Sequence, residues 1–125
     1  MQPEIAHDEG AEYFFREGCH IREWWNRPQD GAASVARARV EPGVTTCWHR
    51  LRGVSERYVV LAGEGRVEVG ETGAVRSEML GHGSVVYIPP GCPQRITNTG
   101  AQDLVFLAIC TPRFLPDCYE ELESV

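Results

Sequence analysis

Two stretches decide how this chain folds: GVTTCWHRLRGVSERYVVLAG at residues 43–63 and GSVVYIPPGCPQRITN at residues 83–98. Glycine opens both stretches, and Gly63 closes the first. Between the turn residues lie runs rich in Val, Ile, Thr and Tyr, which are the residue types that favour β-strands. Similar runs, separated by turns that contain Gly or Pro, recur along the rest of the chain. The sequence therefore predicts an all-β sandwich or barrel.

The strand pattern is plainest at residues 34–40, where small apolar side chains alternate with Val and Arg. Residues 56–61 and 66–69 flank a Gly-Glu-Gly turn and are interpreted as a hairpin. Residues 104–110 are apolar on both faces, as in a strand buried between two layers. Helix is expected only in a short turn over residues 116–123, where Leu115, Tyr119 and Leu122 would pack onto the barrel.

Composition excludes several classes of partner. The chain has 12 basic and 18 acidic residues and a net charge of -6, and no cluster of Lys and Arg is interleaved with aromatic residues. We therefore expect neither nucleic acid nor a membrane as partner. Its five cysteines include no CxxC pair, so they indicate neither a disulfide framework nor a zinc knuckle. The acidic N-terminus does not read as an export leader, which favours a cytoplasmic protein.

Side-chain parity suggests a polar cavity. Alternate residues share one face of a strand, which groups Thr45, Cys47, His49 and Leu51; Glu56, Tyr58 and Val60; and Cys92, Gln94, Ile96 and Asn98. If these three faces converge inside one barrel, they bring an imidazole, a carboxylate, a carboxamide, a phenol and a thiol into a mostly apolar space. A divalent cation is one way to compensate a carboxylate buried there.

The two stretches resemble the paired glycine-framed motifs of the cupin family. The first runs from Gly43 through His49 and Glu56 to Gly63, and the second from Gly83 to Asn98. The resemblance implies a cupin, or double-stranded β-helix (jelly-roll), barrel with a short C-terminal helical turn. We expect one cupin domain over residues 1–125, with its core at about 34–110, N-terminal strands at 11–26 and a C-terminal turn at 112–125.

The resemblance also implies a divalent transition metal (Fe, Zn, Ni, Mn or Cu), held at the positions of His49, Leu51, Glu56 and Gln94. Leu51 cannot coordinate, and Gln94 offers only a neutral carbonyl oxygen, a weaker donor than imidazole toward late first-row ions. The predicted metal ligands are therefore His49, Glu56 and Gln94, in a site that binds metal loosely or not at all. Cys47 would add a thiolate, and His20 could enter from the strand at residues 19–25.

Three functions follow from these residues. The first is a metal-dependent enzyme, a dioxygenase, isomerase or lyase, that acts on a small-molecule substrate. The second is a metal-free dehydratase or isomerase, in which His49 is the base, Glu56 its orienting partner and Tyr58 the acid. The third is a non-catalytic cupin that binds or senses a ligand. Because cupins commonly pair through sheets or N-terminal strands, and residues 13–25 are rich in aromatics, we also expect a homodimer.

Overall fold

The structure, a computed structural model, describes residues 2–8 and 10–123. Its strands are β1 (Tyr13–Phe15), β2 (Cys19–Trp25), β3 (Ser34–Val40), β4 (His49–Leu51), β5 (Ser55–Ala62), β6 (Gly65–Val69), β7 (Arg76–Leu80), β8 (Val85–Ile88), β9 (Gln94–Asn98), β10 (Leu104–Thr111) and β11 (Tyr119–Glu121). A short 3-10 turn, η1 (Pro116–Cys118), precedes β11. No helix among the described residues is long and apolar enough to cross a membrane.

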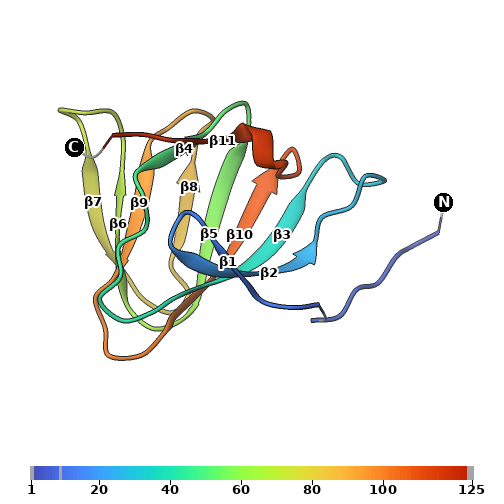
Figure 1. Cartoon of the computed structure of the whole chain (residues 1–125), viewed down its shortest axis with the longest axis horizontal. Coiled ribbons are helices and arrows are strands. Elements are labelled where there is room, and N and C mark those ends of the chain that lie inside the picture. Colours follow the sequence, from blue (N-terminus) through green and yellow to red (C-terminus); the bar gives the residue numbers. More distant parts are fainter. Residues whose placement is uncertain (1, 9, 124–125) are drawn as a thin grey trace.

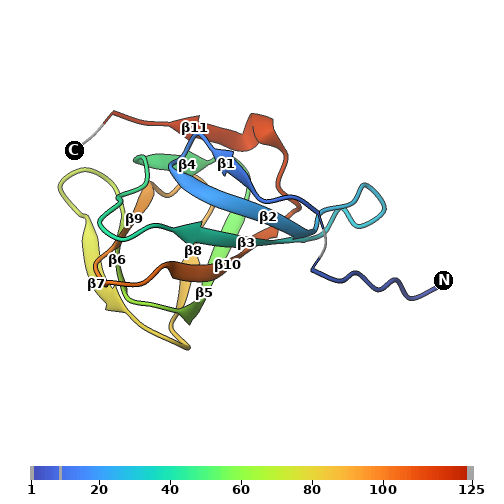
Figure 2. The ribbon, with the colours of Figure 1, turned by 60° about the horizontal axis from the view of Figure 1, so that its bottom comes forward.

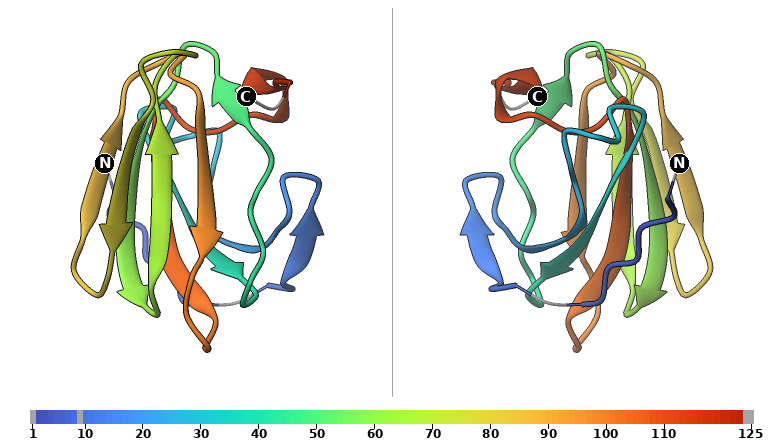
Figure 3. Two further views of the ribbon diagram at one scale, coloured as in Figure 1. Left: turned by 90° about the vertical axis from the view of Figure 1, so that its left-hand side faces the viewer. Right: turned by 90° about the vertical axis from the view of Figure 1, so that its right-hand side faces the viewer.

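The strands form two antiparallel sheets. Sheet A has the order β1-β2-β3-β10-β5-β8, and sheet B has the order β11-β4-β9-β6-β7. Figure 1 shows the two sheets with β11 crossing beside β4, and Figure 2 shows β2, β3 and β10 side by side. In Figure 3 the β1–β2 hairpin and β7 lie at opposite sides of the molecule. The all-β jelly-roll prediction is confirmed.

The core lies between the inner faces of the sheets. Along β3 and β10 every second side chain points inward, as the sequence pattern predicts. The inward positions include Ala38 and Val40 on β3 and Leu104 and Phe106 on β10, all at most 2% exposed. Sheet B adds Val67 and Ile96, while Tyr58 and Val60 enter from β5. Burial of these side chains supplies most of the driving force for closing the barrel.

One predicted pairing is wrong. Strands β5 and β6 do not form a hairpin, because β5 pairs with β10 and β8 whereas β6 pairs with β7 and β9. The chain crosses from one sheet to the other at Gly63, where φ is +86° and an added Cβ would lie 2.6 Å from the carbonyl oxygen of Asp103. A backbone this close leaves room only for glycine, so the turn redirects the chain instead of reversing it within one sheet.

The C-terminal segment also differs from its prediction. The helical turn is limited to η1, and the chain then becomes strand β11, which pairs with β4. Tyr119 packs inward at 5% exposed, whereas Leu115 is 44% exposed and does not pack as predicted. Pairing with β4 matters for the site, because it places Tyr119 against the motif histidine.

Candidate functional site

A cavity opens on the inner side of sheet A. About 60 Å³ of it is open to the centres of water molecules, which is room for roughly four to six waters or one compact organic molecule. Side chains from β1, β2, β3, β5 and β10 line it, together with Glu17 from the β1–β2 turn and Phe114 from the segment after β10. Most of the lining is apolar, and the polar groups are few, as in typical small-molecule sites.

Glu56 is the most unusual group in this cavity. It is the second residue of β5, points inward and is 8% exposed. Its Oε2 atom lies 3.8 Å from the Cys110 thiol, and its Oε1 atom has no hydrogen-bond partner among the described residues. Burial, assisted by the charge of Glu17, raises the pKa of the Glu56 carboxyl to about 8, although the neighbouring Gln94 amide and Cys110 thiol act in the opposite direction. A carboxyl of this kind can both take and give a proton near neutral pH.

Tyr58 and Gln94 form a fixed pair beside Glu56. The Tyr58 hydroxyl donates a hydrogen bond to Oε1 of Gln94, and both side chains are at most 2% exposed. Burial, together with the charge of Glu56, raises the pKa of the Tyr58 hydroxyl well above its usual value. Tyr58 therefore keeps its proton at neutral pH, and the carbonyl oxygen of Gln94 is already engaged as an acceptor.

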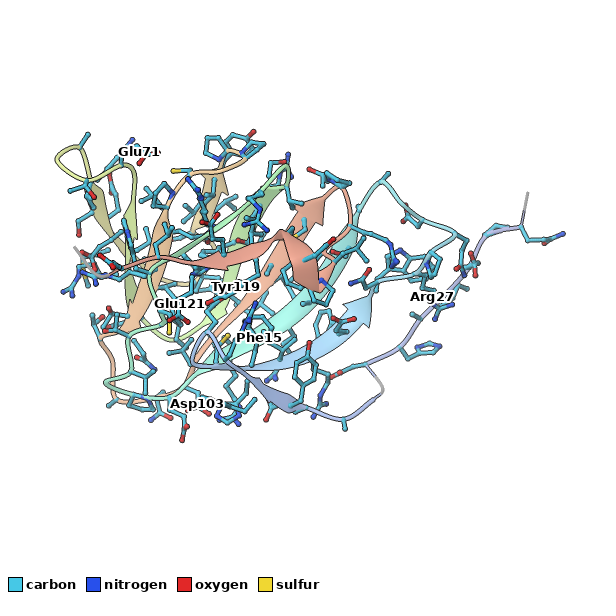
Figure 4. The ribbon with its side chains drawn as sticks, turned by 45° about the horizontal axis from the view of Figure 1, so that its top comes forward. Phe15, Arg27, Glu71, Asp103, Tyr119 and Glu121 are labelled. Carbon is cyan, nitrogen blue, oxygen red and sulfur yellow. The ribbon has the colours of Figure 1, made fainter. Side chains whose placement is uncertain are left out.

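His49 is buried, and both of its ring nitrogens have partners. Nδ1 lies 2.7 Å from the carbonyl oxygen of Cys47, and Nε2 lies 3.2 Å from Oε1 of Glu17. Because a carbonyl oxygen only accepts, Nδ1 carries a hydrogen. The ring stacks on Tyr119 with centroids 5.0 Å apart, and Figure 4 shows Tyr119 close to Phe15 of the N-terminal hairpin. Glu17, not His49, reaches the cavity.

Cys47 does not lie where parity predicts. The chain is irregular before β4, so that Thr46 and Trp48 are buried and His49, directly after Trp48, is buried too. The prediction that Cys47 and His49 share a strand face is therefore wrong. The Cys47 thiol instead donates to the carbonyl oxygen of Arg16 at 3.6 Å.

His20 also lies away from the cavity. Its neighbours on β2, Cys19 and Ile21, line the cavity, so His20 faces the opposite side of the strand. There its Nε2 atom lies 3.1 Å from Glu41, and its ring meets Phe14 edge-on. It does not complete the site.

The side chains present do not fit a metal site of the family kind. Leu51 brings no donor, the Gln94 oxygen accepts from Tyr58, and Nε2 of His49 faces Glu17. In residues 2–8 and 10–123 no three or more His, Cys, Asp and Glu side chains form a group that could hold a metal ion. A metal at His49 would have to displace the contact with Glu17, so we derive no chemical step through a metal.

Three residues of the site were not predicted from the sequence: Glu17, Cys110 and Tyr119. Glu17 precedes Gly18, which has φ of +110° in the turn between β1 and β2. A carboxylate beside a turn glycine is an ordinary surface pattern, and only the pairing of Phe15 with Cys19 carries it inward. Cys110 is recognisable as an inward residue from the alternation of β10, but nothing in the sequence singles out its thiol. Tyr119 was expected to pack, though not against His49.

Comparison with solved structures shows the same fold in proteins of different activity. CapF, a capsular polysaccharide assembling protein of Staphylococcus aureus, is 22% identical with a TM-score of 0.77, over 91% of this chain and 34% of CapF. Oxalate decarboxylase of Bacillus subtilis is 20% identical with a TM-score of 0.81, over 94% of this chain and 31% of that protein. The Streptomyces protein Pac13, a nucleoside dehydratase, is 15% identical with a TM-score of 0.79, over 99% of this chain and 94% of Pac13.

These likenesses show the fold alone, because all of the identities are low. The chain spans about a third of CapF and of oxalate decarboxylase. No curated protein matches it by sequence. The sequence pattern of the Cupin domain, however, matches residues 36–110, more than half of the chain, and the chain therefore belongs to the Cupin domain family.

Proposed function

We propose that this cupin is an enzyme that moves protons on a small organic molecule, as a lyase or isomerase, with Glu56 as its general acid and base. The observation that carries the proposal is the buried Glu56 carboxyl, which lines the cavity and has one oxygen without a partner. A substrate in the cavity would meet that oxygen directly. Its raised pKa supports the same role, since both protonation states are accessible near neutral pH.

A single carboxyl can carry out both halves of such a reaction. As a carboxylate, Glu56 removes a proton from a carbon next to a carbonyl group, and the electron pair of that bond moves toward the carbonyl oxygen. As the resulting carboxylic acid, it returns the proton. In a dehydration the proton goes to the departing hydroxyl, which leaves as water; in an isomerisation it goes to another carbon or to oxygen. In both reactions Glu56 returns to the carboxylate form, and the proton that it removed leaves with the product or with water.

The neighbouring side chains have supporting roles in this scheme. The pair of Tyr58 and Gln94 lies beside the carboxyl and helps to bury it. Cys110 donates to the other oxygen of Glu56, which leaves Oε1 for the substrate. His49 holds Glu17 against the cavity wall. These roles differ from the sequence-based hypothesis, in which His49 is the base and Glu56 orients it.

The comparisons are compatible with this chemistry and do not select it. Pac13 is a dehydratase of nearly the same length, whereas oxalate decarboxylase performs a different reaction on the same fold. Function resides in the site and not in the fold. A ligand-binding protein without catalysis would use the same cavity, and it is distinguished by the experiment below.

The test is solvent deuterium exchange. Small β-hydroxy carbonyl compounds are incubated with the protein in deuterated buffer containing EDTA, and proton NMR follows loss of the C–H signal and appearance of an alkene. We expect turnover that falls about 100-fold or more in Glu56→Gln. It should be retained in the matched variant Glu71→Gln, because Glu71 is exposed and lies away from the cavity-lining Phe15 in Figure 4. Equal turnover in both variants, or turnover only with added metal, would overturn the proposal. Binding without any exchange would indicate the non-catalytic protein.

A further inference from the structure

We propose that the cavity selects a small organic ammonium ion, a protonated primary amine, held between aromatic rings and carboxyl groups. The inference rests on the proposed function only in placing the ligand in the same cavity. It concerns the chemical class of the ligand, which neither the fold nor the comparisons supply.

In the part of the chain that the structure describes, the cavity wall contains acidic side chains and no basic ones. Three carboxyl groups line it: Glu23 on β2, Glu17 in the β1–β2 turn and Glu56 on β5. Among the described residues, no Lys, Arg or His side chain lines it. An anionic ligand such as a carboxylate or phosphate would meet the carboxyl groups of Glu17 and Glu23 and the buried carboxyl of Glu56, with no basic side chain in the described lining to attract it.

The cationic side chains near the cavity are engaged elsewhere. The guanidinium of Arg16 lies 4.6 Å from the ring centroid of Tyr119. Arg113 donates to Oδ1 of Asn26 at 3.0 Å. His49 contacts Glu17 from outside the cavity lining. The chain as a whole carries a net charge of -6, which favours the approach of cations over anions.

Aromatic rings supply the second half of the recognition. Five of them line the cavity: Tyr13, Phe15, Tyr58, Phe106 and Phe114. Phe15 and Phe114 meet edge to face with centroids 6.2 Å apart, and Tyr58 and Phe106 are tilted at 4.6 Å. The faces of such rings attract a cation, more strongly where water is excluded.

The unpartnered oxygen of Glu56 selects among cations. Glu56 is 8% exposed, and its Oε1 atom lacks a donor within the described chain. A primary ammonium group provides N–H donors for this atom, whereas a quaternary ammonium ion or an apolar molecule provides none. The positive charge of a bound ammonium group favours the ionised form of Glu56, and charge-assisted hydrogen bonds to a carboxylate are stronger than neutral ones. The limited volume of the cavity restricts the organic part to a few carbon atoms.

Three probes of nearly the same shape test the ligand class: isobutylamine, isobutanol and isobutyrate, which are cationic, neutral and anionic at neutral pH. Binding is measured on the full chain by NMR titration at constant ionic strength. We expect isobutylamine to bind about tenfold or more tightly than isobutanol, and isobutyrate not to bind. Equal or tighter binding of isobutanol, binding of isobutyrate, or no binding of isobutylamine would overturn the proposal.

Variants locate the selectivity. Glu56→Gln keeps the side-chain shape and should reduce the preference for amine over alcohol to near equality, whereas the matched variant Glu71→Gln should bind like wild type. If Glu56→Gln does not fold, Glu23→Gln at the cavity wall serves instead and should weaken isobutylamine severalfold without affecting isobutanol. If the folded variant, Glu56→Gln or Glu23→Gln, still prefers isobutylamine over isobutanol as strongly as wild type does, the proposal is contradicted.

The readout separates this inference from the proposed function. Loss of amine selectivity together with Glu56-dependent deuterium exchange would refute the ligand class and leave the proton-transfer function standing. Amine selectivity without deuterium exchange on any compound would support the ligand class and refute the proton-transfer function.

Discussion

Glu17 and His49 are in direct contact inside the barrel, where Nε2 of His49 lies 3.2 Å from Oε1 of Glu17. Because Nδ1 donates to the carbonyl oxygen of Cys47, both ring nitrogens of His49 have a fixed partner. His49 belongs to the glycine-framed motif, whereas Glu17 belongs to the N-terminal hairpin. The hairpin therefore completes the site instead of serving only as outer surface.

Removing Glu17 should destabilise the fold. In Glu17→Ala the buried Nε2 atom of His49 loses its partner, and the free energy of unfolding should fall by about 1–3 kcal/mol. Glu17→Gln keeps a hydrogen-bonding group at the same place and should cost less. Urea denaturation of both variants measures the difference, and equal losses would show that the contact with His49 contributes nothing specific.

Stability should fall as pH rises, because of Glu56. Its pKa is about 8 in the folded protein against 4.5 as the ordinary value, so between these values the folded state keeps a proton that the unfolded chain releases. The stabilisation is complete below the lower value and is lost as pH rises through the upper one, with a slope approaching about 1.4 kcal/mol per pH unit.

Glu56→Gln removes this titration. The difference in unfolding free energy between wild type and Glu56→Gln, measured by urea denaturation from about pH 5 to pH 9, should therefore change steadily in favour of the variant. A difference that does not vary with pH would mean that the carboxyl is not held protonated by burial.

Metal should not bind tightly at the motif residues. After purification without a histidine tag, incubation with Zn²⁺, Fe²⁺, Ni²⁺ or Cu²⁺ and dialysis, elemental analysis should find far less than one equivalent, and His49→Ala should not change it. Near-stoichiometric metal that disappears in His49→Ala would contradict our interpretation of the donor set. Metal lost only in Cys47→Ser would point to a different site.

Two motif glycines should differ in their tolerance of alanine. Gly43 and Gly63 both have positive φ, but an added Cβ meets nothing within 4 Å at Gly43 and meets backbone atoms at 2.6 and 2.9 Å at Gly63. Gly43→Ala should therefore cost about 1 kcal/mol of strain, and Gly63→Ala about 3 kcal/mol or more. Thermal unfolding compares them, and similar losses would argue against the close crossing between sheets.

Much of the fold could be predicted from local patterns. Residues 34–40 alternate so regularly that the predicted strand and β3 have the same bounds, and the glycine frames identify the family. The pairing of β5 with β10 and β8 could not be predicted, because a Gly-Glu-Gly turn is compatible both with a hairpin and with a crossing between sheets. The choice depends on Asp103 and Leu104, which approach Gly63 from a distant part of the sequence.

The site was predictable only in part. The inward direction of Glu56 and Tyr58 follows from the period of β5, and both line the cavity as that period requires. The error at Cys47 arose because parity assumes a continuous strand, whereas the chain is regular only from His49 onward. Glu17 was missed because its contact with His49 is long-range. The homodimer and the cytoplasmic location stay predictions.

The most direct test of Glu56 as the acid and base is the titration of its own carboxyl. In protein labelled with ¹³C at glutamate side chains, the Glu56 signal is assigned by its absence in Glu56→Gln and followed over pH. We predict that the buried Glu56 carboxyl is half-titrated near pH 8. A Glu56 signal that titrates near the ordinary value of 4.5 would contradict the account, because such a carboxylate would be too weak a base to remove a carbon-bound proton efficiently at neutral pH.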